Sequence, residues 1–150
     1  AEGEPAGPAG GAPMTDSWTT APPVVPGAVL IGDAAGWNDP IIGQGLSIAM
    51  RDARTVGDVL AAADDWSPGV FADYVDERKE RMRRLAISAR LQTEIRCTFT
   101  DAGRERRARW FQAFMVDPRM LGQTMAILAG PDTVDAASFS DEAVAATLAV

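Results

Sequence analysis

Histidine is absent from the 150-residue sequence, and cysteine occurs once, as Cys97. Histidine is the commonest metal ligand and the commonest general base at neutral pH, so its absence removes both roles. A single cysteine cannot form an internal disulfide, which favours a reducing compartment and argues against a zinc or iron–sulfur site. Any catalysis must come from carboxylates, backbone dipoles or a bound cofactor. We assign no catalytic or metal-binding residue, and we expect Cys97 to be a buried residue with a packing role only.

Long apolar runs are missing as well. No run reaches the roughly 18 residues of a transmembrane helix, and no charged-then-apolar signal peptide opens the chain. Apolar residues make up 47% of the sequence and charged residues 23%, as in an ordinary globular domain. These features predict a soluble, cytoplasmic protein with no membrane partner.

Positive charge is scarce overall, since the net charge is −7, which argues against a nucleic-acid partner. Twelve of the 14 lysines and arginines nevertheless fall between Arg78 and Arg119. They are interleaved with glutamates, and Trp110 and Phe111 are adjacent rather than spaced as a stacking platform. The cluster therefore predicts a solvated face or a subunit contact, which leaves open whether residues 65–150 form a homodimer.

Strand signals are confined to the first third of the chain. Residues 1–13 contain only Ala, Glu, Gly and Pro and predict a flexible linker. "MTDSWTT" is a candidate short strand, and "AVLIG", residues 28–32, fits a strand buried on both faces of a parallel sheet. Such a strand has no sheet to join within this chain, which indicates a piece of a larger fold.

Helical patterns dominate the remainder. A helix of about 18 residues is predicted by apolar residues at three- and four-residue steps, namely Leu46, Ala49, Met50, Ala53, Val56 and Leu60. Asp52 then falls on another face, and we interpret it as a solvated or helix-pairing residue outside any site. Further helices are predicted from Ser67 to about Ile95, over 101–115, over 118–130, and after a Ser140 cap.

The stretch "GDAAGWNDPIIGQGLS", residues 32–47, lies between the predicted strand and the first helix. Asp33 would lie at the carboxyl end of a strand, where α/β proteins bind ligands. Gly43 and Gly45 would let a ligand approach the exposed amides of a helix N-terminus. The pattern suits a polyhydroxylated, partly anionic cofactor. It is not a P-loop, and Ile48 stands where a dinucleotide fingerprint has its third glycine.

This stretch resembles the second FAD-binding motif of class A flavoprotein monooxygenases, the family of para-hydroxybenzoate hydroxylase. The family carries a Gly-Asp-Ala-Ala element, a proline and a Gly-x-Gly-Leu element that opens a helix. Here these are "GDAA" from Gly32 to Ala35, Pro40, and "GQGL" from Gly43 to Leu46. With the preceding strand and the following helix, the similarity covers about residues 24–61.

The resemblance implies the roles of the cofactor-binding residues, which are Gly32, Asp33, Pro40, Gly43, Gln44, Gly45, Leu46 and Ser47. Asp33 would accept a hydrogen bond from a ribityl hydroxyl of FAD, and Pro40 would lie near the isoalloxazine ring. The backbone from Gln44 to Ser47 would face the pyrimidine edge of that ring. Two positions depart from the family. Gly36 replaces a frequent histidine, and Ser47 replaces a frequent asparagine.

The resemblance also implies the fold and the activity. The parent fold would be a three-layer α/β fold that binds FAD and NAD(P), and this chain would be its mostly α carboxy-terminal portion. Residues 1–23 would be a linker and the tail of the substrate domain, residues 24–64 the end of the FAD-binding domain, and residues 65–150 a helical extension. The upstream FAD-binding and substrate domain would be its partner.

The whole enzyme would use NAD(P)H and O₂ to oxygenate a small organic substrate, aromatic or a secondary metabolite, through a flavin hydroperoxide. Two alternatives stay open. One is an oxidase, dehydrogenase or halogenase of the same fold. The other is a non-enzymatic helical module that binds a protein partner. Trp37 is either a surface aromatic or a wall of the active site.

Overall fold

The structure, a computed structural model, describes residues 17–117 and 121–149. The predicted linker over 1–13 and the predicted helix start at Pro118 lie outside these residues. The α-helices and strands in chain order are β1 (Trp18–Thr19), β2 (Val24–Val25), β3 (Ala28–Val29), β4 (Gly36–Trp37), α1 (Gly45–Ala62), α2 (Ala72–Arg96), α3 (Asp101–Val116), α4 (Gly122–Ala129) and α5 (Asp141–Leu148). The predicted predominance of helix is confirmed.

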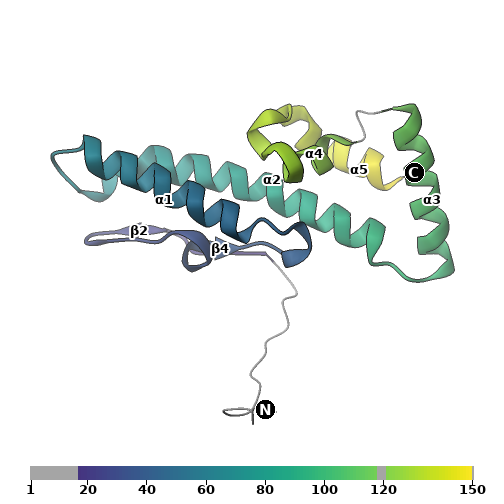
Figure 1. Cartoon of the computed structure of the whole chain (residues 1–150), viewed down its shortest axis with the longest axis horizontal. Coiled ribbons are helices and arrows are strands. Elements are labelled where there is room, and N and C mark those ends of the chain that lie inside the picture. The colour runs from purple at the N-terminus through teal and green to yellow at the C-terminus, as the bar shows by residue number, and fades with distance from the viewer. Residues whose placement is uncertain (1–16, 118–120, 150) are drawn as a thin grey trace, which may run out of the picture.

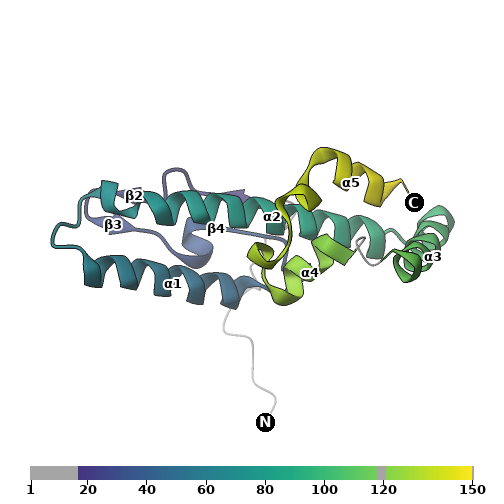
Figure 2. The same cartoon turned by 90° about the horizontal axis from the view of Figure 1, so that it is seen from above.

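Two long helices, α1 and α2, form an antiparallel hairpin that runs along the molecule (Figure 1). The prediction of a helix of about 18 residues is confirmed by α1, which has 18 residues. A short 3₁₀ turn over Pro68–Phe71 leads into the 25 residues of α2. Seen from above, the helices lie side by side, and the strands follow the same long axis (Figure 2).

Two buried apolar clusters hold the hairpin to its neighbours. The first contains Ile42, Ile48, Met82, Leu85 and Ala89. The second contains Val24, Val56, Phe71 and Tyr74. Both draw residues from before and after the α1–α2 loop, so the Gly-rich stretch and the long helix share one core. The predicted apolar face of the second helix is confirmed, because all five of its marker residues are buried, namely Phe71, Tyr74, Met82, Leu85 and Ala89.

The prediction of a doubly buried parallel strand over 28–32 is wrong in extent and in pairing. Only Ala28–Val29 forms a strand, and it pairs antiparallel with Val24–Val25 in a small hairpin. Ile31 is 38% exposed, and Gly32, with φ +54°, begins a 3₁₀ turn. Leu30 and Ile31 therefore belong to no strand, and the turn begins at the last residue of the predicted strand. The candidate strand in "MTDSWTT" is confirmed at Trp18–Thr19, which pairs antiparallel with Gly36–Trp37.

The predicted apolar face of α1 is also corrected. The buried row consists of Ile48, Asp52 and Val56, which face α2 and the Gly32–Ala35 turn. Leu46 is 74% exposed and Met50 65% exposed, and both project from the opposite side. We call this second surface the outer face of α1, and its members are Leu46, Met50, Ala53 and Leu60. Helix α1 thus carries apolar residues on two sides.

The carboxy-terminal third packs on the far half of α2. Helix α4 lies against α2, while α3 stands upright at the end of the hairpin (Figure 1). The predicted Ser140 cap is confirmed, because its Oγ accepts a hydrogen bond from the amide of Ala143 at 3.2 Å. The prediction that Cys97 is buried is wrong. It follows the last residue of α2 and is exposed. No helix of the described chain is both long and apolar enough to cross a lipid bilayer.

Candidate functional site

The Gly-rich stretch folds into a chain of tight turns that leads into α1. Gly32–Ala35 forms a 3₁₀ turn, Gly36–Trp37 is strand β4, and Pro40–Ile42 forms a second 3₁₀ turn. Gly43 takes a left-handed conformation with φ +63°, and its amide donates to the carbonyl of Pro40 at 2.9 Å. This reversal redirects the chain into the first turn of α1.

Some glycines of this stretch leave open space above the backbone, and one allows another strand to pack closely against it. A Cβ at Gly43 or Gly45 would meet nothing within 4 Å, so the space over that backbone is open to a ligand. A Cβ at Gly36 would lie 2.3 Å from the carbonyl oxygen of Trp18, and its φ is +126°. Strand β1 therefore occupies the volume that a side chain at Gly36 needs. A side chain at this position would therefore displace β1.

A cavity of about 110 Å³ opens between this stretch and the start of α1. Its lining residues are Asp33, Trp37, Asn38, Asp39, Pro40, Ile42, Gln44, Gly45 and Ile48. Four of the eight residues predicted to bind the cofactor are among them, namely Asp33, Pro40, Gln44 and Gly45. Gly32 is buried behind the cavity, while Gly43, Leu46 and Ser47 are exposed beside it.

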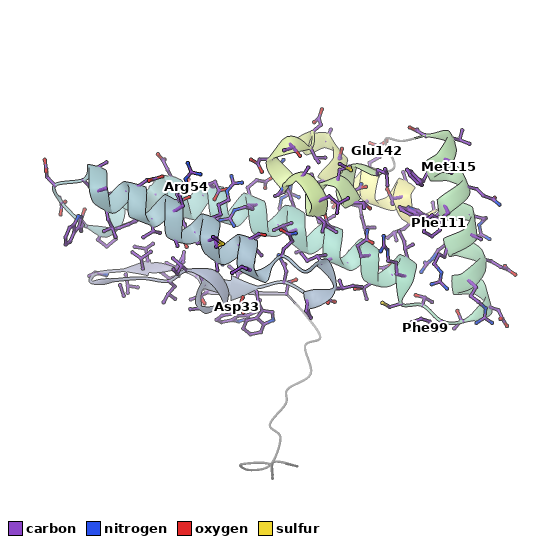
Figure 3. All side chains as sticks on the ribbon, in the orientation of Figure 1. Asp33, Arg54, Phe99, Phe111, Met115 and Glu142 are labelled. Atoms are coloured by element: carbon purple, nitrogen blue, oxygen red, sulfur yellow. The ribbon has the colours of Figure 1, made fainter. Side chains whose placement is uncertain are left out.

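The two carboxylates of the cavity differ in what they bind. Asp39 is engaged at both oxygens, because Oδ1 accepts from the amide of Ile41 at 2.9 Å and Oδ2 from the hydroxyl of Thr93 at 3.2 Å. Asp33 is exposed, and its carboxylate has no hydrogen bond or ion pair within residues 17–117 and 121–149. Figure 3 shows Asp33 on the lower surface, on the loop beneath α1. Asp33 is thus an acceptor open to a ligand hydroxyl.

The side chain of Gln44 is directed away from any ligand and fixes the start of α1. Its Nε2 donates to the carbonyl of Ile127 in α4 at 2.8 Å. The amides of Gly45, Leu46 and Ser47 follow in the first turn, where an α-helix has no acceptor four residues earlier. All three residues are exposed. This end of α1 therefore offers backbone donors and the positive end of its dipole to negative charge.

A buried ion pair holds the loop that carries Asp33. The amide of Gly32 donates to Oδ2 of Asp52 at 2.9 Å, and Nε of Arg78 donates to the same oxygen at 2.8 Å. The remaining nitrogens of Arg78 donate to three loop carbonyls, those of Gly32, Ala35 and Gly36, at 2.9, 3.0 and 3.1 Å. The guanidinium of Arg78 in α2 thus binds both Asp52 of α1 and the backbone of the turn that carries Asp33.

A second arginine completes the environment of Asp52. Nη2 of Arg81 donates to Oδ1 of Asp52 at 2.5 Å, and its Nε donates to Glu77 at 3.0 Å. Burial alone would lower the pKa of Arg81, but its hydrogen bonds with Glu77 and Asp52 raise that pKa above its ordinary value. Arg81 therefore stays charged, and the Asp52 carboxylate lies between two cations.

The prediction of a solvated basic face is wrong for Arg78 and Arg81, which are 2% and 5% exposed. Their charges are neutralised inside the fold by Asp52 and Glu77.

A larger cavity, about 250 Å³, lies nearby and is lined by Arg51, Glu77, Glu80, Arg81, Arg84, Pro131 and Asp132. Its three arginines face three carboxylates, and Arg51 pairs with both Glu77 and Asp132. Since these charges already neutralise one another, we assign no ligand to it.

Sequence reasoning missed Asp52, Arg78 and Asn38 as parts of the site, while Trp37, for which a site wall was one of two alternatives, lines the cavity. A signal for the burial of both charges was present, but it did not identify the partner of either. Asp52 stands four residues from both Ile48 and Val56, and Arg78 stands four residues from both Tyr74 and Met82. A charged residue inside an apolar row with a four-residue step indicates a buried, paired charge. The loop residues Trp37 and Asn38 had no comparable periodic signal.

Comparison with known proteins gives two curated relatives. Over 66 residues, 44% of this chain and 17% of the relative, the sequence is 36% identical to the FAD-dependent urate hydroxylase of Klebsiella oxytoca. Over 70 residues, 47% of this chain and 18% of the relative, it is 36% identical to the 3-demethoxyubiquinol 3-hydroxylase of Escherichia coli strain K12. The chain thus matches less than a fifth of the length of either hydroxylase. No family model and no solved structure matches it.

Proposed function

We propose that this chain is the carboxy-terminal part of an FAD-dependent monooxygenase and that the cavity beside Asp33 is part of its flavin site. The proposal rests on one observation above the others: an exposed carboxylate without a partner in the described chain stands at the rim of a cavity that also contains Pro40 and the start of α1. Its similarity to two hydroxylases, one of them named as FAD-dependent, supports the same assignment.

The residues present fit a flavin. FAD, when bound, supplies the redox chemistry: it takes two electrons from NAD(P)H and activates O₂, of which one atom enters the organic substrate and the other leaves as water. Asp33 accepts a hydrogen bond from a ribityl hydroxyl. The open space over Gly43 and Gly45 lets the ring approach the backbone. The first-turn amides of α1 stabilise negative charge on the ring edge.

We further propose that the outer face of α1 contacts the upstream FAD-binding and substrate domain. Leu46 and Met50 are large apolar side chains that are mostly exposed, and they are spaced four residues apart on one helix. Exposed apolar rows of this kind mark contacts with other protein surfaces. The matched segments account for only 17% and 18% of the two relatives, which are much longer proteins.

The test is the affinity of the native full-length polypeptide for FAD, measured by quenching of flavin fluorescence in the wild type and in Asp33→Ala. Loss of a hydrogen bond to a charged acceptor weakens binding by roughly tenfold or more. Asp58→Asn is the matched control, because Asp58 is exposed on α1 and does not line the cavity. A polypeptide without flavin, or equal affinity in all three proteins, would overturn the assignment.

A further inference from the structure

Two buried polar atoms in the wall of the candidate site have no hydrogen-bond partner within the described chain. They are the indole Nε1 of Trp37 and the amide Oδ1 of Asn38. Both residues belong to the lining of the 110 Å³ cavity, and Asn38 is only 9% exposed. A buried polar atom without a partner destabilises a fold, so the two together point to a ligand that satisfies them.

The contacts of Asn38 determine which of its amide atoms remains available. Its Nδ2 donates to the thioether sulfur of Met82 at 3.8 Å. The thioether sulfur is a weak acceptor and has no proton to donate. If the side-chain amide of Asn38 were rotated by half a turn, Oδ1 would face this acceptor without a hydrogen bond. The amide is therefore held with its oxygen free, and that oxygen requires an N–H or O–H from the ligand.

Trp37 supplies the complementary atom from a fixed ring. Its side chain packs on Trp18 with ring centroids 5.0 Å apart, and its backbone pairs with Trp18 in the β1–β4 ladder. The indole nitrogen only donates, so it requires an acceptor from the ligand. Two neighbouring residues of the cavity lining thus carry one acceptor and one donor that have no partner in the described chain.

The size and charge of the cavity limit the ligand further. A volume of about 110 Å³ is well below the roughly 300–1,000 Å³ of whole small-molecule sites, so the cavity accommodates one edge of a ligand. Asp33 and Asp39 line it as well, and a carboxylate favours a ligand group that donates a hydrogen bond. A neutral edge with an N–H beside a C=O meets all of these conditions.

We propose that Trp37 and Asn38 recognise the edge of a cyclic amide or imide. This inference deepens the proposed function and rests on it, because the pyrimidine ring of FAD presents such an edge. A heterocyclic substrate is the second source of the same chemistry. Asn38 accepts from the ring N–H, and the indole of Trp37 donates to the adjacent carbonyl.

The experiment uses the full-length native polypeptide and two variants. Asn38→Leu keeps the size of the side chain and removes the free acceptor Oδ1 together with Nδ2, which donates to the sulfur of Met82. Trp37→Phe keeps an aromatic ring and removes the indole donor. Trp66→Phe is the control, because Trp66 is 67% exposed and outside this cavity. FAD affinity is measured by fluorescence quenching. Uracil, a simple cyclic imide, is titrated separately while the indole ¹H–¹⁵N signal of Trp37 is followed, assigned by its loss in Trp37→Phe.

Each variant is expected to raise the Kd for FAD by about tenfold, while Trp66→Phe leaves it unchanged. That result identifies the flavin as the ligand. If FAD affinity is unchanged, but uracil shifts the Trp37 signal in the wild type and not in Asn38→Leu, the ligand is a substrate. Unchanged FAD affinity together with no uracil shift would overturn the inference and leave the proposed function intact.

Two further outcomes are decisive. If the wild type binds no FAD, the proposed function fails, and the uracil titration alone decides the inference: a shift of the Trp37 signal that Asn38→Leu abolishes supports it, and any other result overturns it. Unfolding in urea tests whether Asn38 binds a ligand or only stabilises the fold. Removal of its unsatisfied buried oxygen is expected to leave the unfolding midpoint of ligand-free Asn38→Leu unchanged or higher. A lower midpoint would assign Asn38 a structural role and overturn the inference.

Discussion

The carboxylate of Asp52 and the guanidinium of Arg78 lie 2.8 Å apart, and neither side chain is more than 3% exposed. One residue comes from the middle of α1 and the other from the first half of α2. A buried ion pair adds little net stability when its desolvation is counted, but the removal of one partner leaves an uncompensated charge inside the protein. Here both partners also bond Gly32, so the pair determines the conformation of the loop beside Asp33.

Arg78→Met tests this arrangement directly. The substitution leaves Asp52 with one cation fewer and leaves the carbonyls of Gly32, Ala35 and Gly36 without their donor. We expect a loss of about 3–5 kcal/mol in the free energy of unfolding, measured in urea. Arg78→Lys recovers only part of it, because an ammonium lacks the planar fork of donors that reaches three carbonyls and a carboxylate at once.

The control for this prediction is Arg54→Met. Like Arg78, Arg54 is an arginine of the α1–α2 hairpin, but it is exposed and projects from α1 into solvent (Figure 3). Its removal is expected to change the free energy of unfolding by less than about 0.5 kcal/mol. Equal unfolding midpoints for Arg54→Met and Arg78→Met would show that the buried pair does not hold the loop.

Gly36→Ala is expected to destabilise the chain by about 2 kcal/mol or more, since the new Cβ would lie 2.3 Å from the carbonyl oxygen of Trp18 at a φ of +126°. Gly57→Ala, in the interior of α1, is its matched control. A Cβ at Gly57 meets nothing within 4 Å, and the substitution is expected to stabilise the helix by about 0.5–1 kcal/mol. Thermal unfolding of both variants measures the contrast. If Gly36→Ala unfolds at the temperature of the wild type, β1 does not pack on this loop.

The sequence predicted the helices well because their signals are local. The spacing of Tyr74, Met82 and Ala89, eight and then seven residues, follows the turns of a single helix, and the cap by Ser140 involves only neighbouring residues. The Asp52–Arg78 pair required two helices to be placed against one another, and their separation of 26 residues carries no local signal of its partner. The position of the Gly-rich stretch was predictable for the same local reason, since its glycines and proline define turns.

The strand over 28–32 could not be predicted correctly from local pattern alone. An apolar run becomes a buried strand only where neighbouring strands supply its hydrogen bonds, and within the described chain Val29 has only Val24 opposite it. The same argument applies to α1. Its outer face has the apolar spacing of a buried face, but no element of the described chain covers Leu46 or Met50, so the pattern predicted burial where there is exposure.

Tyr74 offers a test by titration, because it is the only tyrosine of the sequence. Its hydroxyl donates to the carbonyl of Leu30 at 2.7 Å, and its side chain is fully buried. Burial, and then the negative charge of Asp52, raise its pKa from 10.0 to about 12. The neutral phenol is thus the form that the fold favours. The absorbance change at 295 nm, taken as the difference from Tyr74→Phe, is expected to occur near pH 12.

The raised pKa of Tyr74 also sets the direction of the pH dependence. Its contribution to stability is fully present below pH 10, the ordinary pKa, and is lost as the pH rises from 10 toward 12. In Tyr74→Phe this loss is absent, so the difference in free energy of unfolding between wild type and variant shrinks over that interval. A phenol that titrates at its ordinary pKa would contradict the buried contact with Leu30.

The two sides of α1 are compared by truncation of one residue on each. Ile48→Ala removes a side chain that is 4% exposed and is expected to cost about 2–5 kcal/mol in the free energy of unfolding. Met50→Ala, on the outer face, is expected to cost less than about 0.5 kcal/mol in the 150-residue chain, because Met50 is 65% exposed there.

The same pair of variants in the full-length native polypeptide tests the proposed contact with the upstream domain. If that domain covers the outer face, Met50→Ala also removes buried apolar surface, and its cost rises to about 2 kcal/mol, while the cost of Ile48→Ala stays the same. Urea unfolding of the two proteins side by side makes the comparison. A cost for Met50→Ala that remains below about 0.5 kcal/mol in both would mean that solvent, and no further domain, covers this face of α1.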